Sequence, residues 1–144
     1  MYLIDTNVIS EYRKGERADA GVRRFFEGTK NGVLFLPAQV IGEIQAGIFR
    51  LRRNGDEAAG VRAQAYQLWL DGLLAQFKDH VLEFDVEAAR VWGTLLSHDR
   101  KDPHTIDKQI AAMALVNDLV VVTRDKGEAF SRIPCVKTLD PFCA

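Results

Sequence analysis

Four acidic side chains in this chain of 144 residues stand where surface charges are uncommon. Asp5 and Asp125 each follow a short apolar run, Glu43 lies inside an apolar helical pattern, and Asp107 opens another one. Carboxylates gathered within a few ångströms repel one another, and a hard divalent cation such as Mg²⁺ or Mn²⁺ removes that repulsion. Such a cation can lower the pKa of a water molecule and stabilise both the attacking and the leaving oxygens of a phosphodiester. The four acids together therefore indicate metal-assisted hydrolysis.

Each of these acids, taken singly, also has a purely structural interpretation. Asp5 is a good N-cap for a following helix, and Asp125 is a common turn residue. Glu43 falls at the edge of its apolar helical arc, which is compatible with a solvated charge. Asp107 lies in the first turn of its helix, where the helix dipole favours an acid. Both interpretations stay open at this point for every one of the four.

Other catalytic chemistries lack their motifs in this sequence. The three histidines, His80, His98 and His104, have no helical pair spacing, and Cys135 and Cys143 have no metal-like partner pattern nearby. The sequence contains no serine-hydrolase elbow, no phosphate-binding Walker loop and no Gly-x-Gly-x-x-Gly turn. We expect the two cysteines to be free thiols in a reducing cytosol, and the protein to be cytoplasmic.

Short apolar runs alternate with longer helical patterns along the chain. Runs rich in Val, Ile, Leu and Phe are typical of strands that are buried on both faces. Such runs lie at Met1–Ile4, Val33–Leu36, Val81–Phe84 and Leu119–Val122, with Pro134–Leu139 as a more exposed fifth candidate. The helical patterns between them are Asn7–Lys14, Asp19–Lys30, Ala38–Arg53, Glu57–Lys78, Val86–Arg100 and Ile106–Asn117.

This alternation predicts right-handed crossovers and a parallel sheet with helices on both faces, which is an α/β sandwich. We expect a single domain over residues 1–144, with a helical arm formed by the two successive helices between Ala38 and Lys78. In an open parallel sheet, ligand sites form beyond the carboxyl ends of the strands, where the strand order reverses. Asp5 and Asp125, at two such ends, could therefore lie close together.

The composition is that of a folded domain, with 47% hydrophobic and 27% charged residues. Nineteen Lys and Arg residues against twenty Asp and Glu residues leave a net charge of −1, which argues against a large basic surface that coats nucleic acid. A nuclease with a locally basic path is not excluded. The longest uncharged run, 31–42, is shorter than the roughly 20 residues of a membrane-spanning helix, and the N-terminus does not read as a secretory signal.

The residues MYLIDTNVISE at 1–11 resemble the opening of PIN-domain proteins, especially the VapC and FitB-like toxins of bacterial toxin–antitoxin pairs. The likeness continues, in the family's order and spacing, in GEI at 42–44, DKQIAA at 107–112 and VTRD at 122–125. The family's acidic quartet falls on Asp5, Glu43, Asp107 and Asp125, and its site hydroxyl falls on Thr123.

The resemblance implies a three-layer PIN-like fold and a Mg²⁺-dependent endoribonuclease, with Mn²⁺ as a possible substitute. The hypothesis is that the chain is the toxin of a type II toxin–antitoxin module, which hydrolyses RNA with metal-activated water. Asp5 and Asp107 would be the central metal ligands, and Glu43 and Asp125 would complete the catalytic pocket directly or through waters. Thr123 would orient waters or phosphate.

The resemblance also implies the partners of the protein. These are a second copy in a homodimer and a VapB-like antitoxin that inserts a basic residue into the acidic pocket, and the toxin–antitoxin complex could bind DNA through the antitoxin. The predicted arm contains more apolar residues than one helix face packed on a small sheet requires. This excess supports a dimer, although burial against the protein's own sheet explains it equally well. The residues are Ile48, Phe49, Tyr66, Leu68, Trp69 and Leu70. Six basic residues could contact RNA phosphates or simply be solvated: Arg13, Lys14, Arg50, Arg52, Arg53 and Arg124.

Two other functions compete with this hypothesis. A phosphatase of the haloacid-dehalogenase type also has an aspartate at a strand end, but it needs a second Asp where Asn7 stands. A non-catalytic PIN-like interaction module would use the pocket only to dock a partner. RNA cleavage that is lost on chelation separates the nuclease from both. Asp99 and Asp102, in the segment before Asp107, are candidate peripheral participants.

Overall fold

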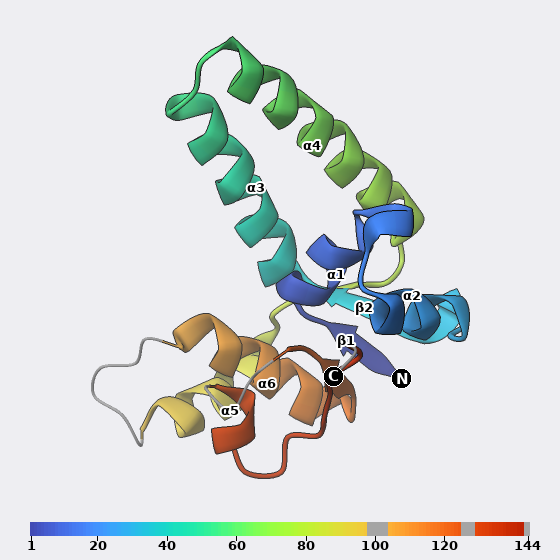
Figure 1. Cartoon of the computed structure of the whole chain (residues 1–144). Helices are drawn as coiled ribbons and strands as arrows, with labels where there is room; N and C mark the ends of the chain where they lie inside the picture. Colours follow the sequence, from blue (N-terminus) through green and yellow to red (C-terminus); the bar gives the residue numbers. More distant parts are fainter. Residues whose placement is uncertain (98–103, 125–128, 143–144) are drawn as a thin grey trace.

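A computed structural model describes residues 1–97, 104–124 and 129–142 of the chain (Figure 1). Five strands form one parallel sheet in the order β3-β2-β1-β4-β5. The strands are β1 (Tyr2–Ile4), β2 (Leu34–Pro37), β3 (Val81–Leu82), β4 (Val120–Val122) and β5 (Thr138–Leu139). The predicted parallel sheet is confirmed. The edge strands β3 and β5 are shorter than their apolar runs, since each pairs on one side only and short edge strands resist pairing with other chains.

Six α-helices lie in the described part of the chain, close to the predicted ranges. They are α1 (Thr6–Tyr12), α2 (Ala20–Glu27), α3 (Ala38–Arg53), α4 (Glu57–Gln76), α5 (Val86–Leu96) and α6 (Thr105–Asn117), with 3₁₀ turns η1 (Gly15–Arg17), η2 (Asn31–Val33) and η3 (Phe130–Arg132). Aspartate side chains accept backbone N–H groups at the starts of α2, α4 and α5, namely those of Asp19, Asp56 and Asp85. The end predicted for α5, residues 98–100, lies outside the described residues.

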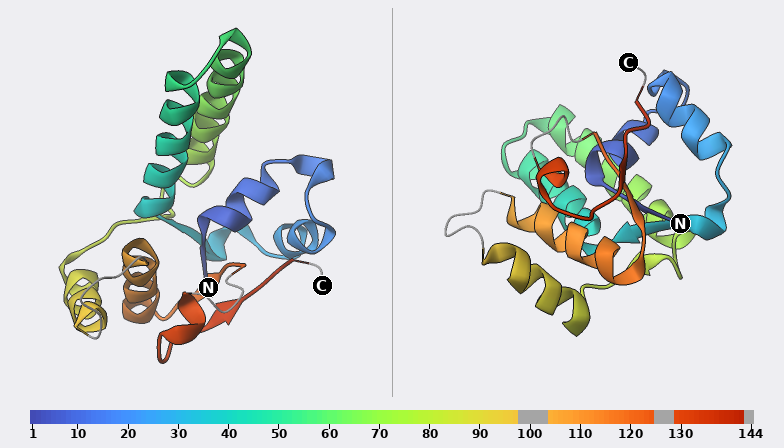
Figure 2. Two further views of the ribbon diagram at one scale, coloured as in Figure 1. Left: turned by 60° about the vertical axis from the view of Figure 1, so that its left-hand side comes forward. Right: turned by 90° about the horizontal axis from the view of Figure 1, so that it is seen from below.

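The helices form two layers that enclose the sheet. α1 packs against α2 and α3 on one side, and α5 packs against α6 on the other (Figure 1, Figure 2). This division follows from the strand order, because a right-handed crossover from β1 toward β2 and β3 uses one face and a crossover back to β4 uses the other. The predicted three-layer α/β/α architecture is therefore confirmed.

The core lies around the two central strands. Leu3 and Ile4 of β1 and Val121 and Val122 of β4 are fully buried. On α6 the small residues Ala111 and Ala114 are also buried, as are Ile110 and Met113. Small side chains on that face let the helix approach the sheet closely, which brings its first turn to the ends of the central strands.

The helices α3 and α4 form the predicted arm, a long antiparallel hairpin that projects from the body of the molecule (Figure 1, Figure 2). Gly55 makes its tight turn possible, because a Cβ atom there would lie 2.6 Å from the carbonyl oxygen of Leu51 and would also meet Ala59 Cβ. Ile48 and Leu70 are buried within the hairpin. No helix in the described ranges combines the length and apolar character needed to cross a membrane.

Candidate active site

The strand order reverses between β1 and β4, where the chain leaves the β1-β2-β3 side of the sheet and begins the β4-β5 side. A crevice forms beyond the carboxyl ends of strands at such a point. Asp5 follows β1 and Thr123 follows β4, and the Asp5 backbone N–H donates to the Val122 carbonyl oxygen at 3.0 Å. The sheet itself therefore brings the two ends of the sequence together at the candidate site.

Asp5 has two roles at this position. Its side chain is 7% exposed, and Oδ1 accepts the Thr6 backbone N–H at 2.8 Å as the N-cap of α1. The other oxygen, Oδ2, accepts the Thr123 hydroxyl at 2.8 Å. The structural interpretation of Asp5 as an N-cap is thus correct, and it is compatible with a place in the pocket because the two carboxylate oxygens have different partners.

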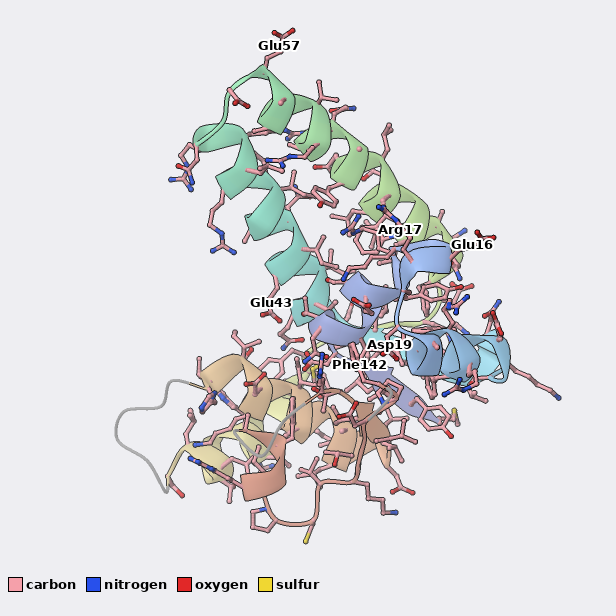
Figure 3. The ribbon with its side chains drawn as sticks, viewed as in Figure 1. Glu16, Arg17, Asp19, Glu43, Glu57 and Phe142 are labelled. Atoms are coloured by element: carbon pink, nitrogen blue, oxygen red, sulfur yellow. The ribbon has the colours of Figure 1, made fainter. Side chains whose placement is uncertain are left out.

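Glu43 joins the site from the base of the hairpin, where Figure 3 shows it on α3. Its Oε1 accepts the Thr6 hydroxyl at 2.9 Å. Glu43 is exposed on one side, but partial burial of the carboxyl raises its pKa, and the charge of Asp5 raises it further. The hydrogen bond from Thr6 acts in the opposite direction. Glu43 is therefore electrostatically coupled to Asp5.

Asp107 lies half-buried in the first turn of α6. Burial raises its pKa to about 6, with further contributions from the charges of Asp5 and Glu43. His104 partly offsets this increase, with Nδ1 lying 3.4 Å from Asp107 Oδ2. Three of the four predicted acids thus share one electrostatic environment. The fourth, Asp125, lies outside the described residues.

Asn7 connects α1 to the segment that follows β4. Its Nδ2 donates to Thr123 Oγ1 at 3.4 Å and to the Arg124 carbonyl oxygen at 3.3 Å, and its Oδ1 accepts the Arg124 backbone N–H at 3.2 Å. These residues line a hollow of about 160 Å³ together with Asp5, His104, Asp107, Ala129 and Phe130. His104 was not predicted as a site residue, although its position three residues before Asp107 is the spacing that puts both on one helical face.

The donor set fits a hard divalent cation. Within residues 1–97, 104–124 and 129–142, no three His, Cys, Asp or Glu side chains form a cluster suited to hold a metal ion. Mg²⁺, however, usually takes only one or two protein carboxylates and keeps several waters. Asp5 and Asp107 line the same hollow, and the pKa of Asp107 is raised first by burial and then by the negative charges of Asp5 and Glu43. A cation bound between them would neutralise that charge. Asp99 and Asp102 lie outside the described residues.

The six predicted basic residues are not gathered in one place. Arg124 lines the hollow, and its guanidinium carbon lies 4.6 Å from the centre of the Phe142 ring. Arg50 lines a neighbouring hollow that also contains Glu43. The guanidinium carbon of Arg13 lies 4.4 Å from the centre of the Tyr66 ring, and that of Arg52 lies 5.6 Å from the centre of the Phe49 ring. Lys14 instead forms an ion pair with Glu11, with 2.6 Å between Nζ and Oε2.

The apolar residues of the arm divide into two groups. Phe49 and Leu68 are 55% and 63% exposed, so burial against the protein's own sheet does not explain them. Tyr66 and Trp69 are partly buried and line a groove of about 310 Å³ between the hairpin and α1. The groove continues to Glu43, so it leads from the arm to the acidic residues; its other lining residues are Thr6, Ser10, Arg13, Ile44, Gly47, Ile48 and Leu51.

Comparison of the sequence with known families finds a match to the PIN domain over residues 2–134. The plasmid stability protein StbB of Pseudomonas syringae pv. tomato is 34% identical over 131 residues, which cover 88% of this chain and 89% of that protein. A VapC ribonuclease of Sinorhizobium fredii is 32% identical over 129 residues, covering 87% of each chain. The match to the PIN domain spans Asp5, Glu43, Asp107 and Thr123.

Comparison of the structure finds a similar fold in the FitAcB complex from Neisseria gonorrhoeae. The TM-score is 0.79 at 26% sequence identity, and 98% of each chain is covered. A second similar fold occurs in FitAB bound to a DNA fragment, with a TM-score of 0.77 and 24% identity over 100% of this chain and 97% of that one.

Proposed function

The chain belongs to the PIN-domain family, and on that premise we propose that it is the Mg²⁺-dependent endoribonuclease toxin of a type II toxin–antitoxin module. The relatives that support this function are the VapC ribonuclease of Sinorhizobium fredii and the toxin FitB of Neisseria gonorrhoeae, to which the chain is 28% identical over 134 residues. The observation that carries the proposal is the convergence of Asp5, Glu43 and Asp107 at the switch point of the sheet.

The residues have distinct proposed roles. Asp5 and Asp107 are the central ligands of the cation, and Glu43 and Asp125 complete the acidic pocket directly or through water. Thr123 donates to Asp5 Oδ2 and so fixes the direction in which that carboxylate points. Asn7 is hydrogen-bonded to both the Thr123 side chain and the backbone of Arg124, which fixes the start of α1 relative to the segment after β4.

When bound, a divalent cation supplies charge neutralisation and a water of lowered pKa for direct attack on phosphorus. The protein supplies the orientation and the proton acceptors. Glu43 Oε1 is held by the Thr6 hydroxyl, so Oε2 is the oxygen at which Glu43 can take up a proton. The raised pKa of Glu43 makes that carboxylate a better proton acceptor than an exposed one.

Two competing functions, a phosphatase and a non-catalytic binding module, can be compared with the residues of the site. The haloacid-dehalogenase-type phosphatase finds no support, because Asn7 occupies the place of its second Asp and is used to bind the backbone of Arg124. A non-catalytic PIN-like module would use the same acidic pocket only to dock a partner. Cleavage assays separate this module from the nuclease.

The antitoxin and the second protomer belong to the same proposal. A VapB-like antitoxin would lie along the groove lined by Tyr66 and Trp69 and place a basic side chain near Asp5, Glu43 and Asp107. An arginine there can bridge two carboxylates. The solved complexes with similar folds include FitAB bound to a DNA fragment, which supports DNA binding by the complex through the antitoxin. The exposed Phe49 and Leu68 support a homodimer.

The test is cleavage of single-stranded RNA by the purified protein in Mg²⁺, in Mn²⁺ and in EDTA. We expect cleavage in both metals and none in EDTA. Asp5→Asn removes the proposed ligand, and Asp85→Asn is the matched control, because Asp85 is also a helix N-cap but lies at the start of α5. Equal cleavage by the two variants would indicate a contaminating ribonuclease and overturn the proposal. A small upstream reading frame that encodes a DNA-binding N-terminus and a disordered tail would support the toxin function independently.

A further inference from the structure

The C-terminal segment contributes an aromatic residue next to the candidate site. Phe142 follows β5 and is labelled in Figure 3. The centre of its ring lies 4.6 Å from the guanidinium carbon of Arg124. Arg124 in turn lines the hollow that contains Asp5 and Asp107. The C-terminal segment therefore contacts the rim of the site.

The segment that leads to Phe142 is anchored at two points. β5 pairs in parallel with β4, and the Thr123 backbone N–H donates to the Leu139 carbonyl oxygen at 2.9 Å. Further along, the Phe142 backbone N–H donates to Asp140 Oδ1 at 2.9 Å. Phe142 is also partly buried against the hydrophobic core. The ring is thus tied to the strand from which Arg124 extends.

The backbone of Arg124 is held as firmly as the ring. Asn7 accepts the Arg124 N–H and donates to its carbonyl oxygen, at 3.2 and 3.3 Å. With the backbone fixed by Asn7 and the guanidinium placed by Phe142, Arg124 loses little further freedom when it binds a ligand. Such an arrangement suits a binding residue better than a solvated surface charge.

The geometry also indicates what Arg124 binds. Stacking on a ring uses the face of the guanidinium and leaves its N–H edges available as a planar fork that matches phosphate. In the described part of the chain, Arg124 makes no ion pair with a carboxylate, although it lies at the rim of an acidic hollow. A phosphate next to the one being cleaved would supply the missing anion.

We propose that Arg124 binds a backbone phosphate of single-stranded RNA adjacent to the scissile one, and that Phe142 is a positioning residue that acts through Arg124. This inference rests on the proposed function, since it states how the substrate of that site is held. It assigns a role in RNA binding to the C-terminal segment after β5.

The first experiment measures binding without cleavage. A short fluorescein-labelled single-stranded RNA is titrated by fluorescence anisotropy against the Asp5→Asn protein at several salt concentrations. Adding Arg124→Ala should weaken binding about tenfold and lower the slope of log K against log salt by about 0.7, which corresponds to one lost phosphate contact. Adding Phe142→Leu should weaken binding about threefold, in line with an exposed cation–π contact.

Phe84→Leu is the matched control, because it also removes a ring that packs against the core, but a ring whose neighbour is Trp92 rather than Arg124. Phe142→Tyr should restore binding, since it keeps the ring. In the active protein, Phe142→Leu should raise KM about threefold and leave kcat unchanged, which a general loss of folding would not do. Circular dichroism and thermal melting check that each variant is folded.

The outcomes separate the two proposals. RNA binding that is unaffected by Arg124→Ala overturns the inference, even if the protein cleaves RNA. RNA binding that depends on Arg124 without any cleavage leaves the inference standing and refutes the nuclease function. If Arg124→Ala weakens binding but Phe142→Leu and Phe84→Leu both leave it unchanged, the positioning role of Phe142 is wrong. If Phe142→Leu does not fold, Phe142→Tyr and Arg124→Lys decide: Tyr should bind normally and Lys weakly, and equal affinity overturns the inference.

Discussion

Thr123 donates its hydroxyl to Asp5 Oδ2 at 2.8 Å across 118 positions of sequence, and both side chains are buried at the ends of adjacent strands. The same hydroxyl accepts the Asn7 amide at 3.4 Å, so it links the carboxylate of β1 to the first turn of α1. A buried carboxylate oxygen that loses its donor becomes costly. The direction of Asp5 in the crevice therefore depends on a residue that is not itself charged.

Replacement of Thr123 by Val tests this dependence. Val keeps the shape but cannot donate, so we expect the free energy of unfolding to fall by about 1–3 kcal/mol. RNA cleavage should fall about 10–100-fold, the usual effect of removing a partner that orients a metal ligand. Urea denaturation and initial cleavage rates measure the two effects. Thr123→Ser, which keeps the hydroxyl, is the control; a loss of the same size in Ser would contradict the role of the hydrogen bond.

The two central carboxylates should respond differently to amide substitution. From the sequence alone, both Asp5→Asn and Asp107→Asn are expected to abolish cleavage and to hold or raise stability, because they relieve repulsion. The structure changes this expectation for Asp5, whose two oxygens accept hydrogen bonds from Thr6 and Thr123. We now expect Asp5→Asn to cost about 1 kcal/mol and Asp107→Asn to be neutral or stabilising. Thermal melting in EDTA distinguishes the two, and retained metal-dependent cleavage in both variants would refute the assignment.

The pKa of Asp107 predicts how pH affects the metal-free protein. The fold raises this pKa from 3.8 to about 6, so the folded state holds the proton more tightly than the unfolded state does. The contribution of Asp107 to stability is therefore fully present below pH 3.8 and is lost as the pH rises through 6. Above that pH, the ionised Asp107 carboxylate lowers the free energy of unfolding by about 1–3 kcal/mol.

Urea denaturation of the unaltered protein and of Asp107→Asn in EDTA checks this sign. The stability gained by Asp107→Asn should be largest near neutral pH and should shrink toward pH 4. Adding Mg²⁺ at neutral pH should stabilise the unaltered protein more than the variant, because the cation removes the repulsion at Asp107. A gain that is independent of pH would show that the carboxyl is not perturbed.

The turn of the hairpin provides a prediction that does not involve the active site. Gly55→Ala should lower the free energy of unfolding by about 1–3 kcal/mol, because the new Cβ would collide with the Leu51 carbonyl oxygen and with Ala59. Gly60→Ala is the control: no atom lies within 4 Å of the added Cβ, and alanine is favoured over glycine within a helix by about 0.5–1 kcal/mol. Chemical denaturation should therefore give shifts of opposite sign.

The proposed antitoxin contact separates affinity from inhibition. Trp69→Ala, in the groove beside the hairpin, should weaken antitoxin binding by about 2–3 kcal/mol while leaving RNA cleavage unchanged. Replacing the inserted arginine of the antitoxin by Ala should instead restore cleavage at high Mg²⁺ and weaken binding only modestly. Calorimetry and cleavage assays measure these effects. Full inhibition by that antitoxin variant at every Mg²⁺ concentration would favour blockage of the RNA path over competition with the cation.

The sequence predicted the elements well because their signals are local. The apolar runs before Asp5 and Thr123 mark β1 and β4, and the spacing of apolar residues places Ala38–Arg53 in one helix. Strand lengths were less predictable, because β3 and β5 end where pairing partners end, and that depends on the position of each strand in the sheet. Local patterns contain no information on which strand lies at an edge.

The acids of the proposed site could be chosen from the sequence, but the connections between them could not. Asp5, Glu43 and Asp107 could be selected as acids next to apolar segments. The links between them, from Thr6 to Glu43 and from Thr123 to Asp5, depend on side-chain directions that are set by tertiary packing. The contact between Arg124 and Phe142 was not predictable either, since it joins two loops that follow different strands.

The central position of β1 also determines when the site can exist during biosynthesis. β1 is made before its two neighbours in the sheet, and β2 can pair with it early, but its other neighbour is β4, whose last residue is Val122. Chains are synthesised at about 5–20 residues per second, so Thr123 is added several seconds after Asp5. A nascent chain therefore carries α3, α4 and the groove between the hairpin and α1 before it has a complete acidic pocket. A binding partner that recognises the hairpin can engage the chain before its catalytic residues come together.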